Sequence, residues 1–311
     1  MSIVEQSVEM LRRVRAERPV VPDEDDVRKP GSQSVEGRAT GSELVASTGA
    51  IATPCRSDWI VRIEVSTLRA AGLVAPQVEE RQLAAECRLI KRPLLAEMTS
   101  RDRPMGNVVI VTSALPNEGK TFMSVNLALS LALERDREVV LVDGDVVKAQ
   151  LTKLWGLESE PGLLDLAAMG LELEQAIVKT DYPSLFVLPA GKKSAEATEI
   201  LRSDRVVSLL ASLASDPRRI VLIDAPPLLA TSEAAVVTSL GGQVLMVVKA
   251  ADTPQEAVMR AAEIIAEDKP VSFVLNQVAL PPVHGYGHYG DYSYGRPDDI
   301  SGSSVSGPSA K

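Results

Sequence analysis

Six short apolar runs, separated by stretches of helical periodicity, dominate the chain from Asn107 to Val278. They read NVVIVTS, EVVLVD, SLFVLPA, RIVLIDAP, QVLMVVK and VSFVLNQV. None alternates between apolar and polar positions, as a strand does when one face meets water, so we expect strands buried on both faces. Strands of this kind, alternating with helices, predict an α/β fold with a mainly parallel sheet and helices on both faces. We assign this domain to residues 101–282.

The chain before this domain divides into three predicted parts. Residues 1–17 place apolar residues at near-helical spacing and predict a short amphipathic helix. Residues 18–56 are too polar and too mixed to form a core, and we expect a flexible linker. Residues 57–100 predict a helical lead-in. There, alternating apolar residues from Ile60 to Val65 precede a short helix that stops at Gly72, and a longer helix from about Pro76 to Met98 breaks or bends near Pro93.

Composition and charge exclude several classes of function. The 311 residues carry a net charge of −9, which argues against a general nucleic-acid binder, so no nucleic-acid partner is expected. The two cysteines, Cys55 and Cys87, provide neither a disulfide framework nor a paired-cysteine metal site. The longest apolar runs fall short of the roughly 18 residues that cross a bilayer, and the first residues show no signal peptide. We therefore expect a cytoplasmic protein.

A phosphate-binding loop follows the first predicted strand of the domain. The segment ALPNEGKT between a strand and a helix is a relaxed P-loop with Ala114 at the first glycine position. In such a loop, backbone N–H groups at a helix N-terminus point at phosphate oxygens, the lysine adds a positive charge, and the hydroxyl binds Mg²⁺. The predicted nucleotide-binding residues are Pro116, Asn117, Glu118, Gly119, Lys120, Thr121 and Phe122.

Acidic residues end two further strands of the predicted sheet. The second strand ends at Asp143 and Asp145, and the fourth ends at Asp224. The carboxyl ends of neighbouring parallel strands border the ligand crevice, so these acids are expected to face the nucleotide and its metal. A single acid at a strand end is often only a helix cap, but three in this order behind a P-loop indicate a Mg²⁺-nucleotide phosphohydrolase or phosphotransferase.

With these motifs the chain resembles the bacterial protein-tyrosine kinases that govern capsule and exopolysaccharide chain length. The motifs of that family read here ALPNEGKT, VLVDGDVVK and IVLIDAPP, followed by the tyrosine cluster YGHYGDYSY, and the resemblance covers roughly residues 80–295. It implies that Lys120 and Thr121 bind phosphates and Mg²⁺. It also implies that Asp143 and Asp224 support the metal, and that Asp145 is the base toward the tyrosine hydroxyl.

The resemblance is strongest to the exosortase-associated branch, in which the kinase has no membrane-spanning half. It implies ATP and Mg²⁺ as cofactors, and autophosphorylation that regulates exopolysaccharide polymerisation or export. The implied partners are a membrane polysaccharide co-polymerase that activates the kinase, further copies of the chain, in a ring in some relatives, and a cognate tyrosine phosphatase. Through the co-polymerase the protein would sit at the inner face of the membrane.

Three departures from the family pattern stand out. The arginine that usually follows the Asp-x-Asp motif is Val147 here, with Lys148 next to it. The helix motif Glu-x-x-Arg-x-x-Arg, which relatives use to form rings, is reduced to Ala85, Arg88 and Lys91, with Glu86 one place along, so the sequence supports a ring less than it supports nucleotide binding. The first P-loop glycine is Ala114, which the family tolerates.

The expected phosphate acceptors lie in the tail, residues 283–311, which is rich in Gly, Ser and Tyr and predicts disorder. Four of the five tyrosines of the chain fall within nine residues there: Tyr286, Tyr289, Tyr292 and Tyr294. Each phosphate would add about −1.5 to −2 charges and should repel the tail from an ATP site. His284 and His288 have the spacing of a metal pair, but the glycine-rich context is not helical and argues against one.

Two alternatives remain open at this stage. A Min- or Par-type positioning ATPase would share the sheet and the metal acids, but Leu115 stands where that class carries its signature lysine. A non-catalytic nucleotide-dependent scaffold of polysaccharide export is compatible with Val147 and the degraded helix motif. Asn276, at the end of the last strand, is a further nucleotide-binding residue by its position, where related ATPases carry an asparagine near the adenine.

Overall fold

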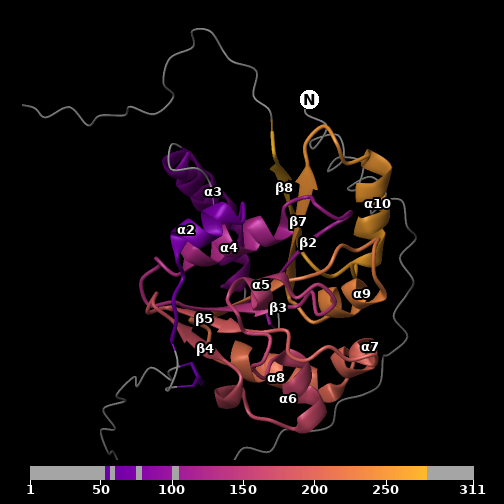
Figure 1. Ribbon diagram of the computed structural model, residues 1–311. Coiled ribbons are helices and arrows are strands. Elements are labelled where there is room, and N and C mark those ends of the chain that lie inside the picture. Colours follow the sequence, from indigo (N-terminus) through magenta and orange to yellow (C-terminus); the bar gives the residue numbers. More distant parts are fainter. Residues whose placement is uncertain (1–52, 57–59, 75–78, 100–104, 279–311) are drawn as a thin grey trace, which may run out of the picture. The chain divides into compact units, whose positions relative to one another are not determined.

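The computed structural model of the protein describes residues 53–56, 60–74, 79–99 and 105–278. Their strands form one sheet in the order β1-β4-β5-β3-β6-β2-β7-β8 (Figure 1). All neighbours run parallel except β4 and β5, which are antiparallel. The strands are β1 (Ile60–Val61), β2 (Val108–Ser113), β3 (Glu138–Asp143), β4 (Val178–Thr180), β5 (Leu185–Leu188), β6 (Arg219–Asp224), β7 (Gln243–Lys249) and β8 (Val271–Asn276).

The six apolar runs all form strands of this sheet, which confirms the predicted mainly parallel α/β fold. The alternating residues at Ile60 and Val61 form the two-residue strand β1. Strand β4 was not predicted, because three residues with an exposed Lys179 in the middle give no apolar run. Its antiparallel pairing with β5 also follows from a short connection, in which the Leu185 N–H donates to the Tyr182 carbonyl at 3.0 Å.

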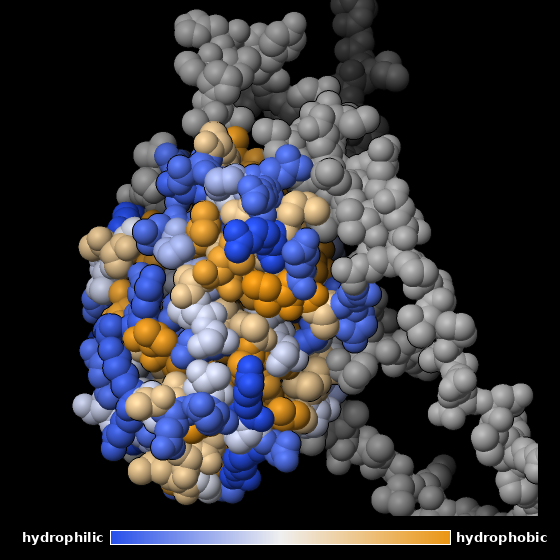
Figure 2. Space-filling model, turned by 90° about the vertical axis from the view of Figure 1, so that its right-hand side faces the viewer, coloured by the Kyte–Doolittle hydropathy of each residue, from blue (hydrophilic) through white to orange (hydrophobic). Residues whose placement is uncertain are grey.

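Helices cover both faces of the sheet, as Figure 1 shows. Alternate residues of each strand point to opposite faces: Val108 and Ile110 pack with the helices from α6 to α10, and Val109 and Val111 with α2, α3 and α4. The helices are α2 (Val65–Ala70), α3 (Glu80–Met98), α4 (Lys120–Leu131), α5 (Gln150–Leu154), α6 (Leu163–Met169), the 3₁₀ turn η1 (Leu173–Gln175), α7 (Ala197–Leu201), α8 (Asp204–Ala214), α9 (Ser232–Ser239) and α10 (Gln255–Ile264). Figure 2 views the side that carries α10, where apolar side chains gather among hydrophilic ones.

The chain before β2 is joined to the sheet at two places, one in the lead-in and one in the predicted linker. Strand β1 pairs with β4, and the Ile63 N–H donates to Asp181. Further toward the N-terminus, the buried Thr53 bonds to Glu138 and accepts a hydrogen bond from Arg219 at 2.8 Å. Glu138 and Arg219 are the first residues of β3 and β6, so the chain is anchored at the amino edge of the sheet within the last residues of the predicted linker. Residues 1–52 and the tail lie outside the described residues.

Helix α3 is continuous through Pro93, so the chain does not break there, and of the two predicted alternatives only a bend remains. Proline removes the hydrogen bond to the carbonyl of Leu89, and Leu89 is 65% exposed, so water can take the place of the lost donor. The short helix α2 ends as predicted at Gly72, whose φ of +68° suits a residue without Cβ. Among the helices of the described ranges, none combines the length and the hydropathy needed to cross a membrane.

Candidate functional site

The P-loop joins β2 to α4 at the carboxyl edge of the sheet. Asn117 and Gly119 both have left-handed backbone, at φ +64° and +93°. A Cβ on Gly119 would lie 2.0 Å from Asn276 Nδ2, so a side chain at this position would clash with the end of β8. Glycine is therefore required both by the turn and by the close approach of a neighbouring strand.

The buried Glu118 stabilises the P-loop through hydrogen bonds. It is 2% exposed, its Oε2 accepts the Leu115 N–H at 2.7 Å, and its Oε1 accepts the Thr253 hydroxyl. Its carbonyl accepts the side-chain amide of Asn276 at 2.9 Å. Glu118 thus ties the P-loop to the loop after β7 and to the end of β8, and it does not line the adjacent cavity.

Thr121 and Asp224 are in direct contact beneath the loop. The Thr121 hydroxyl donates to Asp224 Oδ2 at 2.8 Å, and the Ser124 hydroxyl donates to Oδ1 at 3.0 Å. Burial raises the pKa of Asp224 to about 6, against the opposing effects of Lys120 and the two hydroxyls. The first turn of α4 and the end of β6 therefore form one hydrogen-bonded unit.

The end of β3 is brought against the end of β6 by Gly144. Its N–H donates to the Asp224 carbonyl at 2.9 Å, and a Cβ there would lie 2.6 Å from the Ile223 side chain. A larger residue would push the two strand ends apart. Gly144 thus keeps the flanking carboxylates, Asp143 and Asp145, close to Asp224.

Asp143 is fully buried and only half satisfied. Its Oδ2 accepts both the N–H and the hydroxyl of Thr152 at 2.8 Å, whereas its Oδ1 has no hydrogen-bond partner among the described residues. Burial raises the pKa of Asp143 to about 7, partly offset by the two Thr152 hydrogen bonds. A buried carboxylate oxygen without a partner is an available ligand for a cation or for its water.

Lys120 is 7% exposed and lies among these acids. Burial lowers its pKa, while the charges of Asp224 and Asp145 act in the opposite direction. The site therefore holds a desolvated ammonium group and three carboxylates around the N-terminus of α4. Groups in this arrangement can bind phosphate and a hard cation together.

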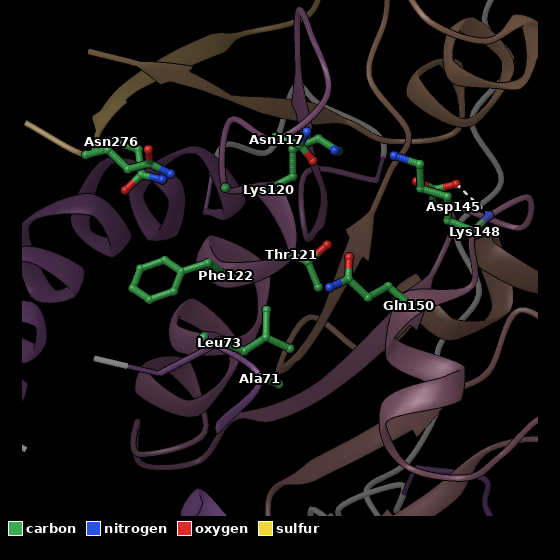
Figure 3. Close-up of a pocket in the computed structure, with 13 residues that line it drawn as sticks. Ala71, Leu73, Asn117, Lys120, Thr121, Phe122, Asp145, Lys148, Gln150 and Asn276 are labelled. Carbon is green, nitrogen blue, oxygen red and sulfur yellow. Dashed lines mark hydrogen bonds between the residues drawn. The ribbon is translucent and has the colours of Figure 1, made fainter. Parts of the chain in front are cut away.

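A cavity of about 390 Å³ opens above these residues. In Figure 3, Asn276 and Phe122 lie at one end, Asp145 and Lys148 at the other, and Lys120 and Thr121 between them. The α2 turn contributes a further wall through Ala71, Gly72 and Leu73. The Leu73 carbonyl is fixed to α4 by the Asn126 side-chain amide at 2.8 Å.

The structure brings most of the sequence-predicted site residues together. Asn117, Gly119, Lys120, Thr121, Phe122, Asp145 and Asn276 line the cavity. Pro116 is exposed on the loop, and Glu118, Asp143 and Asp224 are buried next to the cavity without lining it. The tyrosines Tyr286, Tyr289, Tyr292 and Tyr294 lie outside the described residues.

Sequence reasoning missed the wall from α2 and two polar residues, Gln150 and Gln277. Gln150 follows Lys148 closely, and in Figure 3 its side-chain amide points toward Thr121. A signal for Gln277 existed, because it follows Asn276 at a strand end that borders the crevice. No local signal existed for the Ala71–Leu73 wall, since small and apolar residues after a short helix carry no recognisable chemistry.

Comparison with known proteins gives a consistent result. The chain is 31% identical over 196 residues to the tyrosine-protein kinase YwqD of Bacillus subtilis, covering 62% of this chain and 81% of that protein. It is 33% identical over 147 residues to the tyrosine-protein kinase ptk of Acinetobacter johnsonii, covering 47% of this chain but only 20% of that much longer protein. This chain therefore spans about a fifth of the length of the latter relative.

Solved structures lead to the same group. The kinase domain of the Escherichia coli tyrosine kinase ETK superposes with a TM-score of 0.54 at 27% identity, covering 65% of this chain and 80% of that domain. The BceF tyrosine kinase domain superposes with a TM-score of 0.55 at 23% identity, covering 69% of this chain and 90% of that domain, which bears on the fold alone. A comparison with models of known protein families found no match.

Proposed function

The chain belongs to the family of bacterial tyrosine-protein kinases, and from this premise we propose that it is an ATP- and Mg²⁺-dependent tyrosine autokinase that phosphorylates its own C-terminal tyrosine cluster. The observation that carries the proposal is the contact of the P-loop with the acidic strand ends. Thr121 at the start of α4 donates to Asp224, while Lys120 lies among three carboxylates. This is the set of groups that phosphoryl transfer needs, because that reaction depends on positioning and charge neutralisation.

The residues fit a magnesium ion. Oδ1 of Asp143, which has no hydrogen-bond partner in the described part of the chain, and the oxygens of Asp224 and Thr121 are hard ligands of the kind Mg²⁺ prefers. Within the described ranges, no three His, Cys, Asp or Glu side chains are grouped so as to hold a metal by themselves. That agrees with Mg²⁺, which proteins usually hold with one or two carboxylates while phosphate oxygens and water complete the shell. When bound, the ion would neutralise charge on the phosphates.

The proposed roles of the chain's own residues follow from their positions in the cavity. The backbone N–H groups from Asn117 to Thr121 and the Lys120 ammonium bind the phosphates. Asn276 and Phe122 lie at the far end of the cavity, which suits the base and ribose. Asp145 lies at the opposite end and is the proposed base that takes the proton of the tyrosine hydroxyl.

The tail tyrosines Tyr286, Tyr289, Tyr292 and Tyr294 are the proposed acceptors. Their support comes from the sequence, in which four of five tyrosines fall together behind an intact nucleotide site. We further propose that a membrane polysaccharide co-polymerase activates the kinase at the inner face of the membrane, that copies of the chain associate, and that a tyrosine phosphatase reverses the modification. The proposed role is the regulation of exopolysaccharide polymerisation or export.

The test is intact-mass measurement and phosphotyrosine blotting after incubation with ATP and Mg²⁺, with and without the co-polymerase. Wild type is compared with Lys120→Met and with a chain ending at Pro282. We expect phosphate on the tail tyrosines in wild type, and none in either variant. The Lys120→Met variant loses the phosphate charge partner, and the shortened chain loses the acceptors while keeping the nucleotide site.

Nucleotide binding serves as the control in the same samples. If wild type binds or hydrolyses ATP but carries no phosphotyrosine even with the activator present, the kinase proposal fails. A nucleotide-dependent scaffold or a positioning ATPase would then account for the site.

A further inference from the structure

The turn from Asp145 to Gln150 closes one end of the cavity and has a fixed backbone. The backbone carbonyl of Asp145 accepts the Ala149 N–H at 2.6 Å. Oδ1 of the Asp145 side chain accepts the Lys148 N–H at 3.2 Å. Ala149 itself is in the left-handed region, at φ +48° and ψ +53°, which costs a non-glycine residue about 1 kcal/mol or more. Just beyond the turn, Thr152 is locked onto Asp143. Strain maintained by contacts on both sides is a mark of a functional turn.

This turn brings a second positive charge to the cavity. Lys148 lines the cavity together with Lys120. Burial lowers the pKa of Lys120, and the charge of Lys148 acts in the same direction, so the two ammonium groups interact. Holding the positive charges of Lys120 and Lys148 close together costs electrostatic energy. An anion bound between them would remove this cost.

The order of residues along the cavity identifies which part of the nucleotide meets Lys148. Asn276 and Phe122 lie at one end, Lys120 and Thr121 in the middle, and Asp145 and Lys148 at the other end (Figure 3). A nucleotide whose base lies beside Phe122 and whose phosphates lie over the P-loop would direct its last phosphate toward Lys148.

We propose that Lys148 binds the terminal phosphate of the nucleotide, opposite to the P-loop lysine. The proposal rests on the nucleotide site of the proposed function and deepens it. Val147, which stands where the family pattern has arginine, is 48% exposed and does not line the cavity.

The positive charge of Lys148 has a role in the phosphoryl-transfer reaction. The tyrosine oxygen bonds to the terminal phosphorus, the bond from that phosphorus to the bridging oxygen breaks, ADP leaves with the bonding electrons, and the phenolic proton passes to Asp145. Charge is spread over the transferred oxygens during this step, and a fixed cation beside them stabilises it. Lys148 contacts those oxygens before and during transfer.

Lys153 offers a matched control on the same segment. It carries the same charge five residues away, its ammonium donates to the Lys148 carbonyl, and it is not among the residues that line the cavity. Each variant removes one positive charge, and Lys153→Met also removes the hydrogen bond to the Lys148 carbonyl, so it controls both for the field of the protein and for the anchoring of the turn. A difference between the two variants therefore reports contact with the nucleotide.

The experiment measures equilibrium binding of Mg²⁺-ADP and of a Mg²⁺-bound non-hydrolysable ATP analogue to the full chain by calorimetry. Loss of one charge-assisted contact should weaken analogue binding about tenfold in Lys148→Met, with less than about a threefold change for ADP. Lys148→Arg should stay within about threefold of wild type for both ligands, and Lys153→Met should match wild type, since a charge outside the cavity makes no such contact.

Three results would overturn the inference: no loss in Lys148→Met, an equal loss for ADP and the analogue, or an equal loss in Lys153→Met. These outcomes are independent of the tyrosine chemistry. If wild type binds the analogue but never carries phosphotyrosine, the proposed function fails while the binding comparison still decides the role of Lys148. If wild type is phosphorylated but Lys148→Met keeps full selectivity for the analogue, only this inference fails.

Discussion

At the scale of single residues, the buried carboxylate of Asp143 combines a functional position with a cost to the fold. One of its oxygens has both hydrogen bonds from Thr152 and the other has none among the described residues. The pKa of Asp143 is raised from 3.8 to about 7, so the folded state binds a proton more tightly than the unfolded state. Stability therefore falls as pH rises from about 4 to about 7, and the loss is complete above that range.

We expect Asp143→Asn to stabilise the nucleotide-free protein at pH 8 by about 1 to 3 kcal/mol. The asparagine oxygen can accept both Thr152 hydrogen bonds, and the amide carries no charge to desolvate. Urea unfolding at pH 8 and at pH 4 measures the effect. The gain should be much smaller at pH 4, where wild-type Asp143 is protonated in the folded state and roughly 40% protonated in the unfolded one. A gain of equal size at both pH values would show that the charge of Asp143 is not its cause.

At the scale of elements, the short helix α2 completes a cavity whose other walls come from the P-loop and two strand ends. Its last turn is set by Gly72 at φ +68° and by the Leu73 N–H, which donates to the Leu68 carbonyl at 2.8 Å. Leu68 and Leu73 are buried against the face of the sheet that α3 and α4 cover. The position of this wall therefore depends on packing between segments that lie about fifty residues apart in the chain.

Two adjacent alanines at the end of α2 test this wall. Both Ala70 and Ala71 are exposed, but only Ala71 lines the cavity. We expect Ala71→Glu to weaken Mg²⁺-ATP binding about tenfold or more, because it adds a negative charge to the wall of the cavity proposed to hold the anionic nucleotide. Ala70→Glu, the control, should change the affinity less than about twofold, since its charge is directed to solvent. Fluorescence titration with a labelled nucleotide measures both. Equal affinities in the two variants would refute the assignment of Ala71 to the nucleotide cavity.

At the scale of the whole molecule, the carboxyl edge and the amino edge of the sheet, where the strands end and begin, have different roles. The carboxyl edge holds the P-loop and the acids, where buried groups are left partly unsatisfied. The amino edge holds the buried Arg219, which donates to Thr53 at 2.8 Å and to the Leu213 carbonyl at 3.1 Å. This contact joins the segment at Thr53 to the first residues of β3 and β6, and it contributes to stability without touching the site.

Replacing Arg219 should therefore separate stability from binding. We expect Arg219→Met to lower the free energy of unfolding by about 2 to 4 kcal/mol, because buried partners lose their donor. The nucleotide dissociation constant, measured at a temperature where the variant is folded, should stay within about twofold of wild type, because the site lies at the opposite edge. Arg218→Met is the matched control: Arg218 is 44% exposed and should cause a much smaller loss. A large change in nucleotide affinity for Arg219→Met would contradict the separation of the two edges.

The sequence by itself determined the mainly parallel sheet and the P-loop on which the proposed nucleotide site rests. Strands buried on both faces must be apolar throughout, and a P-loop needs glycine, lysine and threonine at fixed spacing, so both leave local marks such as Gly119 and Lys120. Only the tertiary structure decided that one oxygen of Asp143 has no hydrogen-bond partner within the described ranges, that Glu118 holds the loop against Thr253, and that α2 forms a wall of the cavity. Those facts depend on contacts between residues far apart in the chain, and no local pattern encodes which distant neighbours a side chain will meet.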